Sequence, residues 1–355
     1  MEGQDLFSTG STPTKRTPPS REEWRSLFAS AAEFKKIEPW RWIRETDVFG
    51  VADRQSGEIG YCCIMGELGE VFGMAVYRGT AGLQGYDKIR TGQITPGGSE
   101  VLFCQDCLFV SYDDREELEE SDRRLIRDLG LKFRGRNAWP LFRDYKPGYF
   151  PWTLDRDGVL WMTDALQQAT EVCSRVARGE LVLKPPKKGV YLVRIPVGGG
   201  GTTAWKEEWK EPAPGAERAP AEGPVDELRL RKIRQAAKQT KAAWEVDFFH
   251  VPVPVFSEMR PYFPFAMAIV DNDSGLILEM HLASIDSYRG EFIERFLACV
   301  EGNKVIPKDI VVSSREVAHL LGPWASHLHT EVRVVKKLKT LEKVRRELEG
   351  RLGGA

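Results

Sequence analysis

The chain has 355 residues, of which 42% are hydrophobic and 29% charged, and its formal net charge is -1. This composition is typical of a globular protein, and the length suits two domains. A net charge this close to zero excludes the overall basic excess that a nucleic-acid coat protein needs, although it allows local basic patches.

Residues 1–19 are rich in Ser, Thr, Pro and Gly and carry no apolar core. They predict a disordered tail and not a secretory signal. No window of 18 uninterrupted apolar residues occurs, so we expect no membrane contact. The six cysteines lie mostly in apolar runs, which favours reduced thiols and a cytoplasmic location.

The first domain is predicted over residues 20–200 as an antiparallel β-meander sheet flanked by helices. Ser20 and Glu23 form a capping-box pattern at the start of an amphipathic helix, which Pro39 ends. The strands and helices that follow are predicted from the spacing of apolar residues and from the turn residues between them. The strands are predicted at 48–52, 59–65, 71–77, 101–110 and 189–197, and the helices at 113–130 and 157–177.

The stretch GYCCIMGELGEVFG (60–73) raises the question of a phosphate-binding loop, because it holds four glycines. Such a loop needs a following Lys and Ser/Thr, or a strand-to-helix junction. Here the glycines join two predicted strands, which indicates a hairpin. Cys62 and Cys63 are then expected on opposite faces of the sheet, and Gly73 is expected to relieve crowding on the return strand.

Other familiar catalytic and metal-binding patterns are absent from the sequence. Cys104 and Cys107 form a CxxC pattern inside a predicted strand, without the second pair that a zinc site needs. The five histidines include no HExxH pattern, and no GxSxG elbow occurs. We therefore predict no cofactor, no metal site and no assigned catalytic residue.

A stretch rich in Pro, Ala, Gly and Glu predicts a linker over residues 201–224. The second domain is then expected over 225–355. Its predicted order begins with a basic helix, continues with two apolar strands joined by the turn 271–275, and ends with alternating helices and strands. The order β-β-(β)-α-β-α-β-α is that of a ribonuclease H-like α/β fold.

Asp271 is the sharpest candidate for catalysis. In a ribonuclease H-like nuclease, a carboxylate on the first strand helps to hold two divalent cations, and Asp271 or Asp273 would supply it. The end of the fourth strand, however, carries Ser313 and Ser314 where a second acid is needed. The alternative is that Asp271 belongs to an ordinary hairpin turn, where Asp, Asn and Gly are common.

Two further segments offer binding surfaces. Trp40, Trp42 and Tyr61 would line a cleft, or the tryptophans would simply pack the first helix against the sheet. The basic helix 228–241 would contact a nucleic acid or a protein partner, or would be an ordinary solvated helix.

The string from Pro39 to Leu83 resembles the N-terminal domain of an uncharacterised bacterial two-domain family. The shared features are the Pro-Trp pair followed by a second Trp, the DVFGV strand, the turn with SGE, and the GYC-x-(I/V)-MG strand before a glycine-bearing strand. Residues from about 244 to 341 resemble the partner domain of that family. The resemblance implies two domains and a bacterial cytoplasmic protein, and it carries over no catalytic residue.

The sequence therefore predicts an α+β protein with a non-catalytic binding or regulatory role. The alternative is a divalent-metal-dependent nuclease with a degenerate ribonuclease H-like site around Asp271.

Overall fold

The chain forms two compact units in a computed structural model, and each unit is described by itself. Two short segments, 100–103 and 147–150, belong to the second unit, although the chain around them belongs to the first. The predicted tail and linker lie mostly outside the described residues. The structure describes residues 17–94, 100–198, 204–214, 226–251, 253–256 and 260–343.

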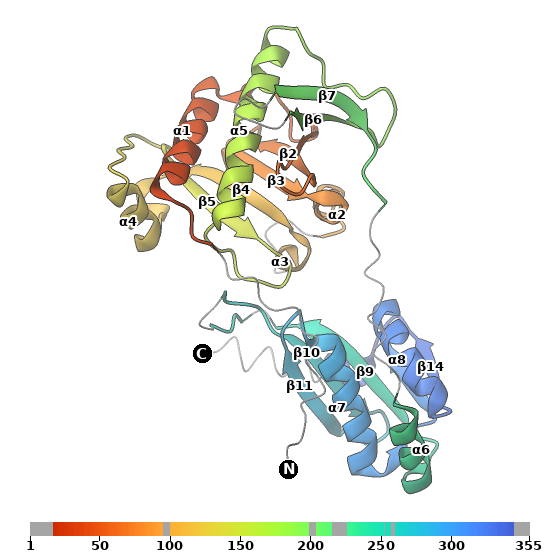
Figure 1. The fold of residues 1–355 in the computed structure, drawn as a ribbon. Helices are drawn as coiled ribbons and strands as arrows, with labels where there is room; N and C mark the ends of the chain where they lie inside the picture. Colours follow the sequence, from red (N-terminus) through yellow and green to blue (C-terminus); the bar gives the residue numbers. More distant parts are fainter. Residues whose placement is uncertain are drawn as a thin grey trace. The chain divides into compact units, whose positions relative to one another are not determined.

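The first unit is built on a seven-stranded sheet with the order β5-β4-β3-β2-β1-β6-β7 (Figure 1). Neighbouring strands are antiparallel except β1 and β6, which are parallel. The α+β class predicted from the sequence is confirmed. The strands are β1 Phe49–Ala52, β2 Ile59–Met65, β3 Gly73–Arg78, β4 Cys107–Asp113, β5 Trp139–Tyr145, β6 Tyr191–Val197 and β7 Ala204–Lys210.

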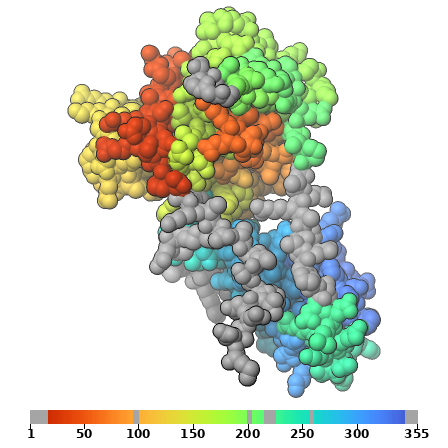
Figure 2. Space-filling view, in the orientation of Figure 1, coloured from red at the N-terminus to blue at the C-terminus, as the bar shows by residue number. Residues whose placement is uncertain are grey.

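Helices cover both faces of this sheet. The long helices α1 (Arg21–Ile37) and α5 (Arg156–Ala177) lie side by side on one face, as Figures 1 and 2 both show. Helix α2 (Gly79–Arg90) packs on the other face. The capping box predicted at Ser20 is present, with Glu23 as its partner. Shorter helices complete the unit: η1 Pro39–Arg41, η2 Arg115–Glu117 and α4 Glu120–Asp128. Helix α3, Val101–Cys104, lies almost wholly in a segment of the second unit.

The stretch 60–73 forms the predicted hairpin between β2 and β3. Cys62 belongs to the core under α1 and α5, whereas Cys63 belongs to the core under α2. A Cβ on Gly73 would lie 2.1 Å from the carbonyl oxygen of Val110, so only glycine lets β3 approach β4 at this point. The hairpin and the opposite facing of the two cysteines are therefore confirmed.

The second unit holds a five-stranded sheet with the order β11-β10-β9-β13-β14. Strands β9, β10 and β11 are antiparallel, and β13 runs parallel to both β9 and β14. Helices α7 and α8 pack on one face of the sheet. The elements are α6 Glu227–Ala236, β8 Lys238–Gln239, β9 Ala243–His250, β10 Phe265–Asp271, β11 Ile277–Ala283, α7 Tyr288–Asn303, β12 Val305–Ile306, β13 Asp309–Val312, α8 Arg315–His327 and β14 Glu331–Val334.

Several elements differ from the prediction. Residues 204–210 of the expected linker form β7, because this charged strand pairs with β6 at the edge of the sheet. The basic helix ends at Ala236, since the next residues pair with β12. Cys104 ends a short helix and Cys107 begins β4, so the CxxC pattern does not lie within one strand.

A further difference, in the second unit, concerns strand order. Ala243–His250 forms the first strand, β9, and the strand that ends at Asp271 is the second. The first-strand position that the nuclease hypothesis gave to Asp271 therefore belongs to β9. Acidic residues inside AWEVDFFH hide this strand from a reading based on apolar runs.

Candidate functional site

A cavity of ≈310 Å³ lies at one edge of the first unit's sheet. Strands β1, β3 and β5 run in the same direction, so their carboxyl ends meet at this edge. Helix α5 begins at the same place. The lining residues are Asp53, Gln55, Ser56, Arg78, Leu108, Asp144, Leu154, Asp155, Asp157, Gly158 and Trp161.

Arg78, the last residue of β3, is the cation of this cavity. Its Nε donates to Asp106 Oδ1 at 2.6 Å, and its Nη1 pairs with Asp144 Oδ1 at 2.8 Å. Its Nη2 donates to the carbonyl oxygen of Tyr145. Burial alone would lower the pKa of Arg78, but Asp144 and Asp106 hold it above its usual value. The guanidinium is thus permanently charged and engaged on all three nitrogens.

The N-terminus of α5 supplies two of the lining carboxylates. Asp155 caps the helix, because its Oδ1 accepts a hydrogen bond of 3.0 Å from the N–H of Gly158. Asp157 is exposed and makes no ion pair among the described residues. Both carboxylates suit the positive end of the helix dipole.

Trp161, one turn further along α5, forms part of the cavity wall and is 7% exposed. A Cβ at Gly60 would lie 2.9 Å from Trp161 Cζ2, so a glycine in β2 makes room for the indole. The Nε1–H of Trp161 is buried and finds no acceptor among the described residues. A buried indole N–H usually has a partner.

Two more carboxylates close to this edge have raised pKa values. Burial raises the pKa of Asp164 to about 6, although Arg54 pairs with it at 2.7 Å. Burial, with the neighbouring Asp106, also raises the pKa of Glu58. Both shifts come chiefly from burial, and neighbouring carboxylates add to each of them.

A second cavity, of ≈350 Å³, lies between α1 and the β4–β5 side of the first unit. Its lining includes Lys35, Lys36 and Glu38. Lys35 Nζ donates to the carbonyl oxygen of Asn137, and burial lowers the pKa of Lys35. The lining carries two lysines against one glutamate, a formal surplus of one positive charge.

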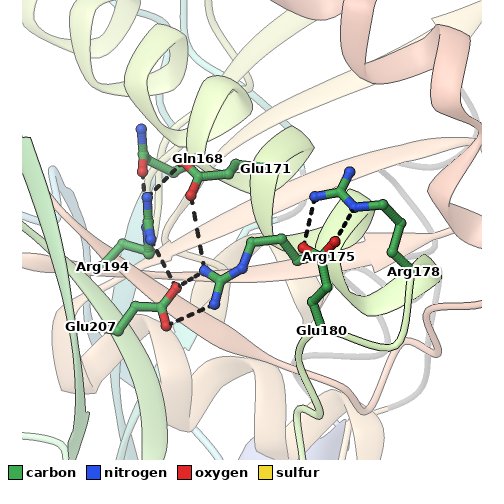
Figure 3. Close-up of polar contacts among 7 residues, drawn as sticks. All are labelled: Gln168, Glu171, Arg175, Arg178, Glu180, Arg194 and Glu207. Carbon is green, nitrogen blue, oxygen red and sulfur yellow. Dashed lines mark hydrogen bonds and ion pairs between the residues drawn. The ribbon is translucent and has the colours of Figure 1, made fainter.

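A different part of α5 takes part in a polar network around Arg194 of β6 (Figure 3). Arg194, 5% exposed, donates to Gln168 Oε1 at 2.9 Å, to Glu207 Oε1 at 2.7 Å and to Glu171 Oε2 at 2.7 Å. Arg175 also donates to Glu207. Two arginines thus meet two glutamates, and the network is charge-balanced.

The residues that sequence analysis selected for a cleft do not come together. Trp40 packs against Phe72 with tilted rings, whose centroids are 5.1 Å apart, at the core under α1 and α5. Tyr61 lies in the core on the opposite face of the sheet. Trp42 is 38% exposed and its Nε1 donates to the carbonyl oxygen of Cys173 at 3.2 Å. None of the three lines either cavity described above, and a binding role for them stays a prediction.

Asp271 lies in the turn between β10 and β11. Its Oδ1 accepts hydrogen bonds from the N–H and the hydroxyl of Ser274, at 2.8 and 2.7 Å. Burial alone would raise the pKa of Asp271, but these hydrogen bonds lower it. Gly275 adopts φ +71°, which the turn requires. Among the described residues no group of three or more potential metal ligands occurs, so no contact there supports a metal role for Asp271.

The turn after β1 repeats this geometry in the first unit. Asp53 Oδ2 accepts from the N–H and the hydroxyl of Ser56, at 2.9 and 2.7 Å, and Gly57 has φ +73°. Both turns follow the pattern D-x-x-S-G. Asp53 differs from Asp271 because it also lines the acidic cavity.

The basic helix α6 uses part of its charge within the second unit. Arg229 donates to Glu301 at 2.9 Å and to Glu294 at 2.6 Å, both on α7. Leu230 and Ile233 are buried in the core. Lys232 has no described ion pair, and the predicted contact with a nucleic acid or protein remains a prediction.

Sequence analysis did not select Arg78, Asp144 or Trp161. The turn at Asp53 was recognised, but as a turn only. The sequence did carry a signal for this site, because a charged residue lies at or near the end of each of β1, β3 and β5. Using that signal would have required knowledge of strand β5 and of the strand order.

The chain matches two family models, both described as domains of unknown function. DUF7309 covers residues 24–194 and DUF6930 covers residues 229–349. The matches support a two-domain protein of an uncharacterised family. A comparison with functionally characterised proteins gives no match. Within the described part of the chain, no helix has the length and apolar character needed to cross a membrane.

Proposed function

We propose that the protein is a non-catalytic binding protein whose first unit holds the cationic group of a small organic ligand. The observation that carries this proposal is the charge of the ≈310 Å³ cavity, which is lined by four aspartates and one arginine. That arginine, Arg78, already pairs with Asp144 and with Asp106. By formal charge, the described lining therefore carries four negative groups and one positive group.

A cation is the natural partner of such a surplus. Carboxylates crowded in a partly enclosed cavity repel one another, and a bound positive group relieves that repulsion. The positive end of α5 offsets only about half a charge. A cavity of this size is at the small end of ligand sites, which run from roughly 300 to 1,000 Å³. An amine or guanidine of modest size fits both the charge and the volume.

A matched screen tests the charge of the ligand. Small primary amines and guanidines, each paired with a carboxylate of the same shape, are titrated against the full chain at low salt and followed by NMR. Binding is expected only among the cations, and it should weaken as salt screens the aspartates. Binding of the carboxylates, or of neither set, would contradict the proposal.

Variants locate the site. Asp157→Asn and Asp53→Asn each remove one lining carboxylate. Each should lower the affinity for the tightest-binding cation by about tenfold, which corresponds to roughly 1.4 kcal/mol. Glu180→Gln is the control, because Glu180 is an exposed acid that pairs with Arg178 away from the cavity. Equal loss of affinity in all three variants would argue for a non-specific effect of net charge.

We also infer that the second unit is ribonuclease H-like. The support is the sheet order, in which three antiparallel strands (β9, β10, β11) are followed by β13 and β14 on the other side of β9. Asp247 of β9 would then occupy the first-strand carboxylate position, and its Oδ1 accepts from Ser313 at 2.9 Å. A Mg²⁺ and Mn²⁺ titration of the full chain should show no shift at Asp247; strong binding lost in Asp247→Asn would revive the nuclease alternative.

The bacterial and cytoplasmic assignments also remain proposals. Burial raises the pKa of Cys62 and Cys107, and all six cysteines are free thiols, which agrees with a reducing compartment. Thiol counting by alkylation in cell lysate, before and after reduction, should give the same number.

A further inference from the structure

The charges of the second unit are distributed unevenly along the chain. Residues 228–241 hold six Arg or Lys and no Asp or Glu, whereas residues 271–301 hold seven Asp or Glu and two Arg or Lys. The basic segment comprises most of helix α6, strand β8 and the residues that lead to β9. A near-neutral unit therefore keeps a strongly basic segment in one place.

Helix α6 divides its basic residues between two sides. Arg229 pairs with two glutamates of α7. Arg234 lies five positions further on, which places it about 140° around the helix axis from Arg229. Its Nη1 lies 3.2 Å from Nε2 of the exposed His329, and it forms no ion pair with a carboxylate among the described residues. Helix α7 therefore neutralises only one side of α6.

Main-chain and amide contacts bring two further segments to the other side. Strand β8 pairs in parallel with β12, and the N–H of Lys238 donates to the carbonyl oxygen of Lys304 at 2.9 Å. The N–H of Lys308 donates to a carbonyl oxygen just before β9, also at 2.9 Å. Gln239 Nε2 donates to the carbonyl oxygen of His329 at 3.3 Å. Three segments that are distant in sequence thus meet on one surface of the second unit.

Five cations from these segments form what we call the basic surface. All five are exposed, and none forms an ion pair with a carboxylate in the part of the chain that the structure describes. The acid beside them is Glu331, whose N–H donates to the carbonyl oxygen of Lys308. Gathered like charges repel one another, and a bound polyanion relieves that repulsion. The basic surface consists of Arg234, Lys238, Lys241, Lys304 and Lys308.

The composition of the basic surface favours one kind of polyanion. Residues 228–241, 304–308 and 327–331 include no Trp, Tyr or Phe. Proteins that hold single-stranded nucleic acids rely on aromatic side chains, on which the bases stack. A duplex keeps its bases stacked internally and presents one phosphate charge for about every 1.7 Å of its axis. An acidic protein surface mixes both signs of charge and is less dense, so the duplex is the better match.

We propose that the basic surface binds the phosphate backbone of a double-stranded nucleic acid without reading its sequence. Phosphate contacts from Lys and Arg position a protein on a duplex but carry no sequence information. The basic surface lies on the second unit and attracts a ligand of the opposite charge from the cavity of the first unit. The proposal therefore does not depend on the cation site.

Duplex binding is measured on the full chain by fluorescence anisotropy. Short labelled DNA and RNA duplexes are used, each in two unrelated sequences. In about 50 mM salt, a dissociation constant on the order of ten micromolar is expected, equal within about twofold for the two sequences. The logarithm of the affinity should fall linearly with the logarithm of the salt concentration, by about 0.9 for each phosphate contacted. Binding of either duplex supports the proposal, and the comparison of DNA with RNA identifies which backbone fits better.

Charge-removing variants locate the contact. Lys238→Gln and Lys304→Gln remove cations that come from two different segments of the basic surface. Each should weaken duplex binding about fivefold in low salt and reduce the salt slope by about 0.9. Arg315→Gln is the matched control, because it removes an exposed cation at the start of α8, and His329 follows the other end of that helix. The control should keep the affinity and slope of the wild type. Thermal unfolding of all three variants should match the wild type, since the side chains are exposed.

Four results would overturn the proposal. The first is the absence of binding to either duplex in low salt. The second is an equal loss of affinity in Arg315→Gln, which would indicate a general effect of net charge. The third is tighter binding of a single strand than of the duplex. The fourth is equal binding of polyglutamate of matched charge, with the same losses in the variants, which would assign the basic surface to an acidic protein.

Discussion

Two arginines on the first sheet, Arg194 and Arg78, make a direct comparison. Arg194 is buried and Arg78 is partly buried, and both donate through Nε and both Nη atoms. Around Arg194, two cations meet two glutamates (Figure 3). Around Arg78, two aspartates pair with the guanidinium and further aspartates line the adjoining cavity. A balanced network needs no ligand, whereas an unbalanced one retains attraction for a charge from outside.

The largest expected effect comes from Arg78→Met. The variant removes the guanidinium that pairs with the buried Asp144 and with Asp106, and breaking a buried pair in this way costs about 4 kcal/mol at neutral pH. Without Arg78 the two carboxylates repel each other while both are ionised, and protonation at low pH relieves that repulsion. The deficit, measured by urea unfolding, should therefore shrink toward pH 4. A deficit that grows on acidification would show that the aspartates are not the source.

Arg194→Met should cost about 3 kcal/mol, because Glu171 and Glu207 are partly exposed, can be rehydrated and keep Arg175 as a partner. Affinity for the best amine should not change. Arg178→Met is the matched control, since Arg178 pairs with Glu180 at the surface, and its urea midpoint should equal that of the wild type. Loss of amine binding in Arg194→Met would remove the distinction between the two arginines.

Asp164→Asn tests the cost of burying a carboxylate near this cavity, because the variant removes its negative charge. Burial raises the folded pKa of Asp164 to about 6, above the unfolded value near 3.9. Its contribution is therefore fully present below pH 4 and is lost as pH rises through 6. Asparagine escapes this loss, so the variant should gain on the order of 2 kcal/mol at pH 7 and nothing at pH 4. Urea unfolding at both pH values checks the sign, and Asp157→Asn serves as an exposed control.

The smallest effects separate the two D-x-x-S-G turns. Asp53→Ala and Asp271→Ala each remove two turn hydrogen bonds, and each should cost about 1 kcal/mol in thermal or urea unfolding. Only Asp53→Ala should also weaken amine binding, because only Asp53 lines the cavity. If the two variants weaken binding equally, the cavity is not the binding site.

Local pattern was enough for much of the first unit. The capping box at Ser20, the helix that became α5, and the hairpin in 60–73 all follow from neighbouring residues, and the structure contains each of them. The two strands that the sequence analysis missed in this unit, β5 and β7, both lie at an edge of the sheet. Strand β5 contains Pro140, and β7 is mostly charged, as edge strands often are. Apolar periodicity does not mark such strands.

The candidate site could be predicted only in part. The turn at Asp53 is a local feature, and D-x-x-S-G predicts it wherever it occurs. The same pattern at Asp271 was recognised equally well and led to the nuclease hypothesis. The carboxylate of Asp271, however, is hydrogen-bonded within its own turn.

The sequence by itself determined the elements whose cause is short-range: capping, helical spacing and turn chemistry. Only the tertiary structure decided that Arg78, Asp144 and Trp161 share one cavity. Their positions lie on β3, β5 and α5, and they meet because alternating antiparallel strands return every second carboxyl end to the same edge. The four aspartates and one arginine of that lining come from several segments of the chain. The net charge of the whole sequence, -1, therefore does not reveal them.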